Sequence, residues 1–123
     1  MTQIMVVDDE APVRNLLSDV LEKEGYEVFT AETGAEASEI FNSHNIDLII
    51  TDLVMPVKGG IDLIMEVKKK DKDTKIIAIS GGGGITGRFD YLPIAKLVGA
   101  TEIIAKPFRV AEIRSQVAKI LAA

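Results

Sequence analysis

The 123-residue chain contains no cysteine, no tryptophan and a single histidine, His44. Without cysteine it can form neither a disulfide nor a thiolate zinc site, and it has no thiol for catalysis. One histidine also falls short of the nitrogen ligands that zinc or copper prefers. His44 lies in the polar segment of residues 42–45, where we expect an ordinary surface residue.

A basic excess and a long hydrophobic run are absent as well. The 14 basic residues are outnumbered by 19 acidic ones, which gives a formal charge of −5. Nonspecific affinity for nucleic acid is mainly electrostatic, so an acidic chain is a poor candidate for it. No run approaches the roughly 20 apolar residues that span a bilayer, and no signal-peptide pattern opens the chain. We therefore expect a cytoplasmic protein that binds neither nucleic acid nor membrane.

What the chain does contain is a regular alternation of two patterns. Continuous apolar runs are typical of strands buried on both faces of a parallel sheet; they occupy residues 4–7, 46–50, 75–79 and 102–105, with a weaker one at 27–29. Between them, apolar residues repeat at helical spacing over residues 13–21, 35–43, 61–69, 91–98 and 110–121. Pro12 near the start of the first helix and Gly25 just past its end support that assignment. Five successive βα units predict one doubly wound α/β domain over residues 1–123.

Polar residues stand where these strands end. Asp8 and Asp9 follow the first strand, Asp52 the third, Ser80 the fourth and Lys106 the fifth. Each has an ordinary explanation when taken alone, such as a helix cap, a turn or a surface lysine. In open α/β sheets, however, ligands bind beyond the carboxyl ends of the strands. A flavodoxin-like strand order, 2-1-3-4-5, would make the first and third strands neighbours and gather the three carboxylates at one edge.

Such a cluster favours a metal-dependent phosphoryl-transfer site. Adjacent carboxylates repel one another unless a cation neutralises them, and a hard divalent ion such as Mg²⁺ suits an all-oxygen site. Lys106 and the Ser80 hydroxyl could then bind an anion that arrives at the metal. Positioning and charge neutralisation are most of what phosphoryl transfer requires.

Three segments carry a resemblance to a known family. They are Val6-Val7-Asp8-Asp9-Glu10, then residues 47–56 with Gly59-Gly60, and Lys106-Pro107-Phe108. They resemble the signatures of response regulator receiver domains, the signalling modules of two-component systems, and the resemblance covers essentially the whole chain. It implies a flavodoxin-like (βα)5 fold with a five-stranded parallel sheet in the order 2-1-3-4-5.

The resemblance also implies a role for each site residue. Asp52 is expected to be the phosphoacceptor, with Mg²⁺ held by Asp8, Asp9, Asp52 and the main-chain carbonyl of Val54. Lys106 would contact the phosphoryl group.

The same resemblance implies how the switch operates. The Ser80 hydroxyl would move toward the phosphoryl group, and the Lys106–Pro107 peptide occupies a position that is usually cis in the family. The aromatic residue that generally stands three positions before the lysine is replaced here by Ile103. A coupled rotation of an aromatic ring is therefore not expected in this chain.

The implied function is a phosphorelay switch. A sensor histidine kinase or a phosphotransfer protein would phosphorylate the chain, and an unidentified downstream protein would read its altered surface. The domain would catalyse only its own phosphorylation and slow dephosphorylation, so we do not expect an enzyme with turnover. We expect no effector domain in residues 1–123.

Two alternatives come from other functional classes. A Mg²⁺-dependent phosphohydrolase could use Asp52 as nucleophile, but such enzymes typically need an acid two residues further on, where this chain has Val54. A flavin-binding module of the same topology is disfavoured because aromatic residues make up only 5% of the chain and an acidic cluster would repel the flavin phosphate.

The glycine-rich stretch of residues 81–87 contains a G-x-G-x-x-G pattern, which is typical of dinucleotide sites. Only one strand follows it, however, so no dinucleotide-binding half can form. It also lacks the Lys and Ser/Thr of a P-loop, because Arg88 and Phe89 stand there.

Overall fold

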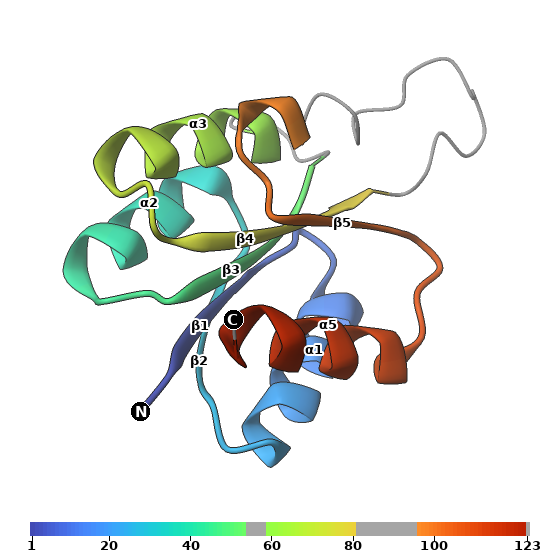
Figure 1. Ribbon diagram of the computed structural model, residues 1–123. Coiled ribbons are helices and arrows are strands. Elements are labelled where there is room, and N and C mark those ends of the chain that lie inside the picture. The colour runs from blue at the N-terminus through green and yellow to red at the C-terminus, as the bar shows by residue number, and fades with distance from the viewer. Residues whose placement is uncertain (54–58, 81–95, 123) are drawn as a thin grey trace, which may run out of the picture.

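The computed structural model describes residues 1–53, 59–80 and 96–122 (Figure 1). Five strands are present: β1 (Gln3–Val7), β2 (Glu27–Ala31), β3 (Leu48–Asp52), β4 (Lys75–Ser80) and β5 (Glu102–Ala105). The helices are α1 (Ala11–Lys23), α2 (Gly34–Ser43), α3 (Gly60–Lys70) and α5 (Val110–Ala122). Residues 96–98 are also helical, and the rest of the helix predicted over residues 91–98 lies outside the described part of the chain.

The strands form one parallel sheet in the order β2-β1-β3-β4-β5. This order confirms the flavodoxin-like, doubly wound α/β fold expected from the sequence. The third strand was placed slightly wrong, since it begins at Leu48 rather than Ile46 and extends to Asp52. Ile46 is apolar because it is buried, with 5% of its surface exposed, at the end of the sheet and not within a strand.

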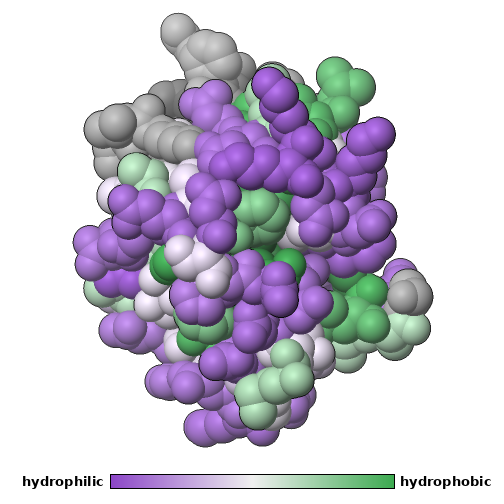
Figure 2. Space-filling view, turned by 90° about the vertical axis from the view of Figure 1, so that its left-hand side faces the viewer, coloured by the Kyte–Doolittle hydropathy of each residue, from purple (hydrophilic) through white to green (hydrophobic). Residues whose placement is uncertain are grey.

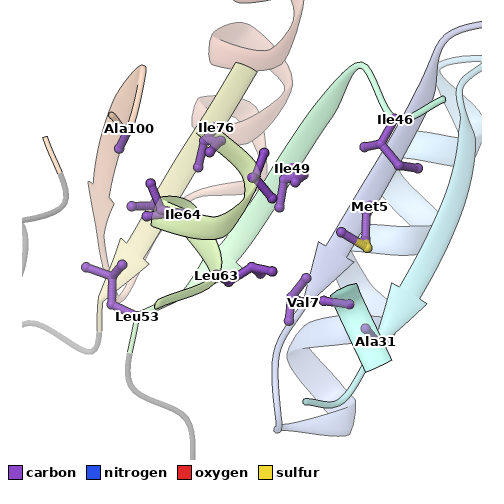
Figure 3. Close-up of a cluster of buried hydrophobic side chains, with 13 residues drawn as sticks. Met5, Val7, Ala31, Ile46, Ile49, Leu53, Leu63, Ile64, Ile76 and Ala100 are labelled. Carbon is purple, nitrogen blue, oxygen red and sulfur yellow. The ribbon is translucent and has the colours of Figure 1, made fainter. Parts of the chain in front are cut away.

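Alternate residues of the buried strands pack into two cores, one on each face of the sheet. Met5, Val7 and Ile49 face α2 and α3, whereas Ile4, Val6 and Ile50 face α1 and α5 (Figures 1 and 3). A residue period of two places neighbouring side chains on opposite faces. The continuous apolar runs in the sequence therefore result from helices covering both faces of a parallel sheet.

One face of the molecule is predominantly hydrophilic (Figure 2). On the side that lies at the left of Figure 1, purple residues dominate and green ones form smaller groups between them (Figure 2). Within the described ranges, no helix combines the length and the apolar character that crossing a membrane requires. The large hydrophobic side chains exposed among these residues are Met1, Leu16, Met65 and Leu97.

Gly60 allows α3 to start directly against the end of β3. Its amide donates to the carbonyl of Leu53 at 3.1 Å. A Cβ at this position would lie 2.7 Å from the Leu53 Cα and closer still to the carbonyl oxygen of Asp52. Because these neighbours are main-chain atoms, they cannot move aside as a flexible side chain could. Gly60 thus ties the position of Asp52 to the packing of α3.

We expect Gly60→Ala to lower the free energy of unfolding by about 2 kcal/mol, because the added methyl group overpacks a main-chain contact. Gly25→Ala is the matched control. Gly25 has a φ of +94°, and an added Cβ would meet no atom within 4 Å. That variant therefore carries only the backbone strain of the left-handed region. Urea unfolding of both variants measures the difference, and an unchanged midpoint for Gly60→Ala would contradict the close packing described here.

Candidate phosphoryl-transfer and metal site

Four carboxylates meet at the carboxyl end of the sheet. Asp8 directly follows β1, where its amide donates to the carbonyl of Ala31 at 3.1 Å. Asp52 is the last residue of β3. One carboxylate oxygen from each of Asp8, Asp9, Glu10 and Asp52 lies within 4.8 Å of the others. Asp8 and Asp52 are buried, with 1% and 6% of their surface exposed, whereas Asp9 and Glu10 face solvent.

Lys106 joins this cluster from the end of β5. Its Nζ lies 3.1 Å from Asp52 Oδ2, 3.2 Å from Asp8 Oδ2 and 3.4 Å from Glu10 Oε1. Its side chain is 16% exposed, so the contacts with Asp8 and Asp52 are largely shielded from water. The Lys106–Pro107 peptide is cis, the isomer that the family resemblance implies. A cation from the fifth strand thus bridges carboxylates from the first and third.

Burial and neighbouring charges shift the pKa values of this cluster. Burial raises the pKa of Asp8, and the charge of Asp52 adds to the rise, while the Glu10 amide and Lys106 oppose it. Burial alone would lower the pKa of Lys106, but the charges and hydrogen bonds of Asp52 and Asp8 outweigh it and raise that pKa. Lys106 is therefore fully protonated at neutral pH.

The donor set fits a hard divalent cation. Four carboxylates face one ammonium group, so negative charge remains in excess. The ligand atoms are all oxygens, and the exposed side chains of Asp9 and Glu10 leave one side open to water. Mg²⁺ prefers oxygen ligands and usually retains several of its waters. The residues present would accordingly hold Mg²⁺ well.

Comparison with known proteins identifies the family. Residues 4–118 match the model of the response regulator receiver domain. The chain belongs to this family. The phosphotransfer protein of sporulation initiation in Bacillus subtilis, sporulation initiation phosphotransferase F, is 34% identical over 119 residues, covering 97% of this chain and 93% of that protein. The chemotaxis protein CheY of the same organism is 35% identical over 120 residues, covering 97% of each chain.

Solved receiver structures share the fold. The response regulator TrrA of Thermotoga maritima, solved in complex with Mg²⁺ and BeF, is 38% identical with a TM-score of 0.83, covering 98% of this chain and 99% of that one. The receiver domain of NtrX from Brucella abortus is 30% identical with a TM-score of 0.88, covering 98% of each chain.

The receiver domain brings together most of the residues predicted from the sequence. Asp8, Asp9, Asp52 and Lys106 all lie in one cluster. For Ser80, only the main chain is described: it ends β4 in register with Ala105.

Two predictions fall on residues that the structure does not describe. The carbonyl of Val54, predicted as a metal ligand, lies outside the described residues. So does the glycine-rich stretch of residues 81–87.

Two residues of the receiver site were not predicted individually. Glu10 adds a fourth carboxylate and a third partner for Lys106. Its position next to Asp9 was the available signal. Arg14 donates from Nη1 to the carbonyl oxygen of Asp8 at 2.8 Å. A basic residue close to the start of a helix, where acidic residues are favoured, could have drawn attention to it.

Proposed function

We propose that this receiver domain is a phosphorylation-controlled switch. Asp52 accepts a phosphoryl group, in a Mg²⁺-dependent reaction, from a sensor histidine kinase or a phosphotransfer protein. The observation that carries this proposal is the convergence of Lys106 on two buried carboxylates from different strands. Lys106 belongs to neither of the two apolar cores, whereas a site that handles phosphate requires both a cation and a carboxylate nucleophile.

In this proposal an oxygen of Asp52 attacks the phosphorus while the bond to the donor breaks on the opposite side. Lys106 exchanges carboxylate oxygens for an oxygen of the transferred phosphoryl group. Asp8, Asp9, Asp52 and the Val54 carbonyl would hold Mg²⁺, which neutralises negative charge on the phosphoryl oxygens when bound. The complex of TrrA with Mg²⁺ and BeF supports the same arrangement here.

We place the surface that a partner reads at β5, residues 96–98 and α5. Lys106 directly follows β5 and lies shortly before α5. A change in its contacts can therefore displace the end of β5. Leu97 is 86% exposed, and Lys96 donates from Nζ to the carbonyl of Thr101 at 3.0 Å. Ile103 is only partly buried against the core, and Arg109 is exposed. The downstream partner is a protein, and the cytoplasmic location expected from the sequence is part of the proposal.

Adding beryllofluoride with Mg²⁺ should shift backbone amide resonances mainly in β5, residues 96–98 and α5, because the phosphoryl mimic recruits Lys106. The Ser80 amide and residues 81–88 should shift as well. Two-dimensional NMR spectra of labelled protein measure this, with Asp52→Asn as the control that should not respond. Shifts confined to α1 and α2 would show that another face carries the signal.

A switch differs from a phosphohydrolase in turnover. We expect the protein to release phosphate from acetyl phosphate no faster than its own aspartyl phosphate decays. Phosphate release and bound phosphoryl groups, followed in the same sample, measure this. Rapid release of many equivalents of phosphate per chain, with little phosphoprotein present, would favour a phosphohydrolase.

A further inference from the structure

Arg14 connects the two loops at the acidic end of the sheet. From α1, its Nη1 donates to the carbonyl oxygen of Asp8 at 2.8 Å, and its Nη2 lies 3.3 Å from Glu32 Oε1. Asp8 follows β1 and Glu32 follows β2. The Arg14 side chain is 13% exposed, whereas the Glu32 side chain is 66% exposed. The bond to the Asp8 carbonyl is thus the better shielded of the two contacts.

The position of Arg14 in the helix is unusual for a residue that only stabilises α1. A positive charge near a helix N-terminus opposes the helix dipole. The first turn of α1 contains no acidic residue, and the side chain of the N-cap residue Glu10 makes no capping hydrogen bond to the helix. Helical side chains lean toward the N-terminus, which lets Arg14 reach back to Asp8. The contact therefore serves the loop rather than the helix.

This contact completes a set of bonds that fixes Asp8. Its amide donates to the Ala31 carbonyl at 3.1 Å, and its carbonyl accepts from Arg14. Its Oδ1 accepts from the Glu10 amide at 2.9 Å. The remaining oxygen, Oδ2, is thereby directed at Lys106, 3.2 Å away. With both ends of its main chain and one carboxylate oxygen held, Asp8 has little freedom left.

We propose that Arg14 is a positioning residue for the metal site. It holds the main chain at Asp8 so that the Asp8 and Asp9 carboxylates are arranged for Mg²⁺ before the ion arrives. This inference rests on the proposed function, since it assumes that these acids bind Mg²⁺. Its basis is the hydrogen bond to the Asp8 carbonyl and not the exposed ion pair with Glu32, because exposed ion pairs contribute little.

The test compares Mg²⁺ dissociation constants, measured by NMR titration of the folded, phosphate-free protein. Arg14→Met should weaken Mg²⁺ binding by about tenfold, the scale seen when residues that orient metal ligands are removed. The Asp9 and Glu10 amides should also shift in the metal-free spectrum. Glu32→Gln, which keeps the bond to the Asp8 carbonyl, should remain within about twofold of the parent. Arg114→Met, on the exposed side of α5, is the control for loss of one positive charge.

The conservative variant Arg14→Lys distinguishes positioning from charge. A lysine keeps the positive charge but replaces the rigid, planar guanidinium, which fixes the direction of the bond to the Asp8 carbonyl, with an ammonium on a flexible stem. We expect it to weaken Mg²⁺ binding several-fold, less than Arg14→Met does. If Arg14→Met fails to fold, Arg14→Lys replaces it in the test. An Mg²⁺ affinity equal to that of the parent in Arg14→Lys would then overturn the inference.

Other outcomes separate this inference from the proposed function. If the parent protein binds no Mg²⁺, the proposed function is wrong. If the parent binds Mg²⁺ but Arg14→Met binds it equally well, only the role of Arg14 is wrong. Loss of a positive charge makes the protein more negative and by itself favours Mg²⁺ binding, so an equal loss in Arg114→Met would mean that the effect is not specific to the bond with Asp8. An equal loss in Glu32→Gln would mean that the ion pair with Glu32, and not the bond to Asp8, sets the affinity.

Discussion

Replacing Lys106 with methionine should lower the free energy of unfolding of the metal-free protein by about 3 kcal/mol at pH 7, the scale for breaking a buried ion pair. Methionine has a similar length and no charge. The variant would leave Asp8 and Asp52, both more than 90% buried, facing each other without their shared cation. Because the pKa of Lys106 is raised in the folded protein, its stabilising contribution is fully present at neutral pH and is lost only above its ordinary value of 10.5.

The loss of unfolding free energy in Lys106→Met should become smaller as the pH falls. The pKa of Asp8 is already raised by burial, and removing Lys106 takes away an influence that opposes the rise. The folded variant will therefore bind a proton at pH values where the unfolded chain has already released it. Whenever the folded state binds more protons, lowering the pH through that pKa increases stability.

Urea unfolding at pH 7 and at lower pH, with and without Mg²⁺, measures both effects. Mg²⁺ should recover much of the loss, because the cation neutralises the same carboxylates. Lys119→Met, at an exposed position of α5, serves as the control for removing one lysine charge. A loss below about 0.5 kcal/mol, the size typical of surface changes, would mean that Lys106 contributes no more than a surface ion pair.

The sequence predicted this fold well because its signals are local. A strand buried on both faces must be apolar throughout, and β1, β4 and β5 were located within a residue of their observed bounds. The strand order then placed Asp8 and Asp52 together, since the carboxyl ends of neighbouring parallel strands share one edge. Residue type and topology were sufficient for the main elements of the site.

Other features depend on contacts that no local pattern contains. Ile46 looked like the start of a strand because burial at a sheet end and burial within a strand demand the same apolar residue. Gly60 was named only as part of a family signature, and no local pattern indicates that the carbonyl of Asp52 packs against it. Arg14 was not singled out from the sequence. Only the three-dimensional arrangement shows that its guanidinium holds the main chain of a buried carboxylate.

Asp52→Asn should abolish phosphorylation. The amide has nearly the shape of the carboxylate, so the close packing against Gly60 and the end of β3 is preserved. It carries no negative charge, however, and its oxygen cannot serve as the nucleophile that attacks phosphorus. Asp8 and Asp9 cannot replace it in this account, because their carboxylates are needed for the cation and Asp8 is directed at Lys106.

The most direct measurement is the intact mass of the protein after incubation with Mg²⁺ and acetyl phosphate. The account predicts that the parent gains one acid-labile phosphoryl group, that omitting Mg²⁺ prevents the gain, and that Asp52→Asn gains none. Labelling of Asp52→Asn to the same extent as the parent would contradict the assignment of Asp52 as phosphoacceptor, and with it the central claim about this site.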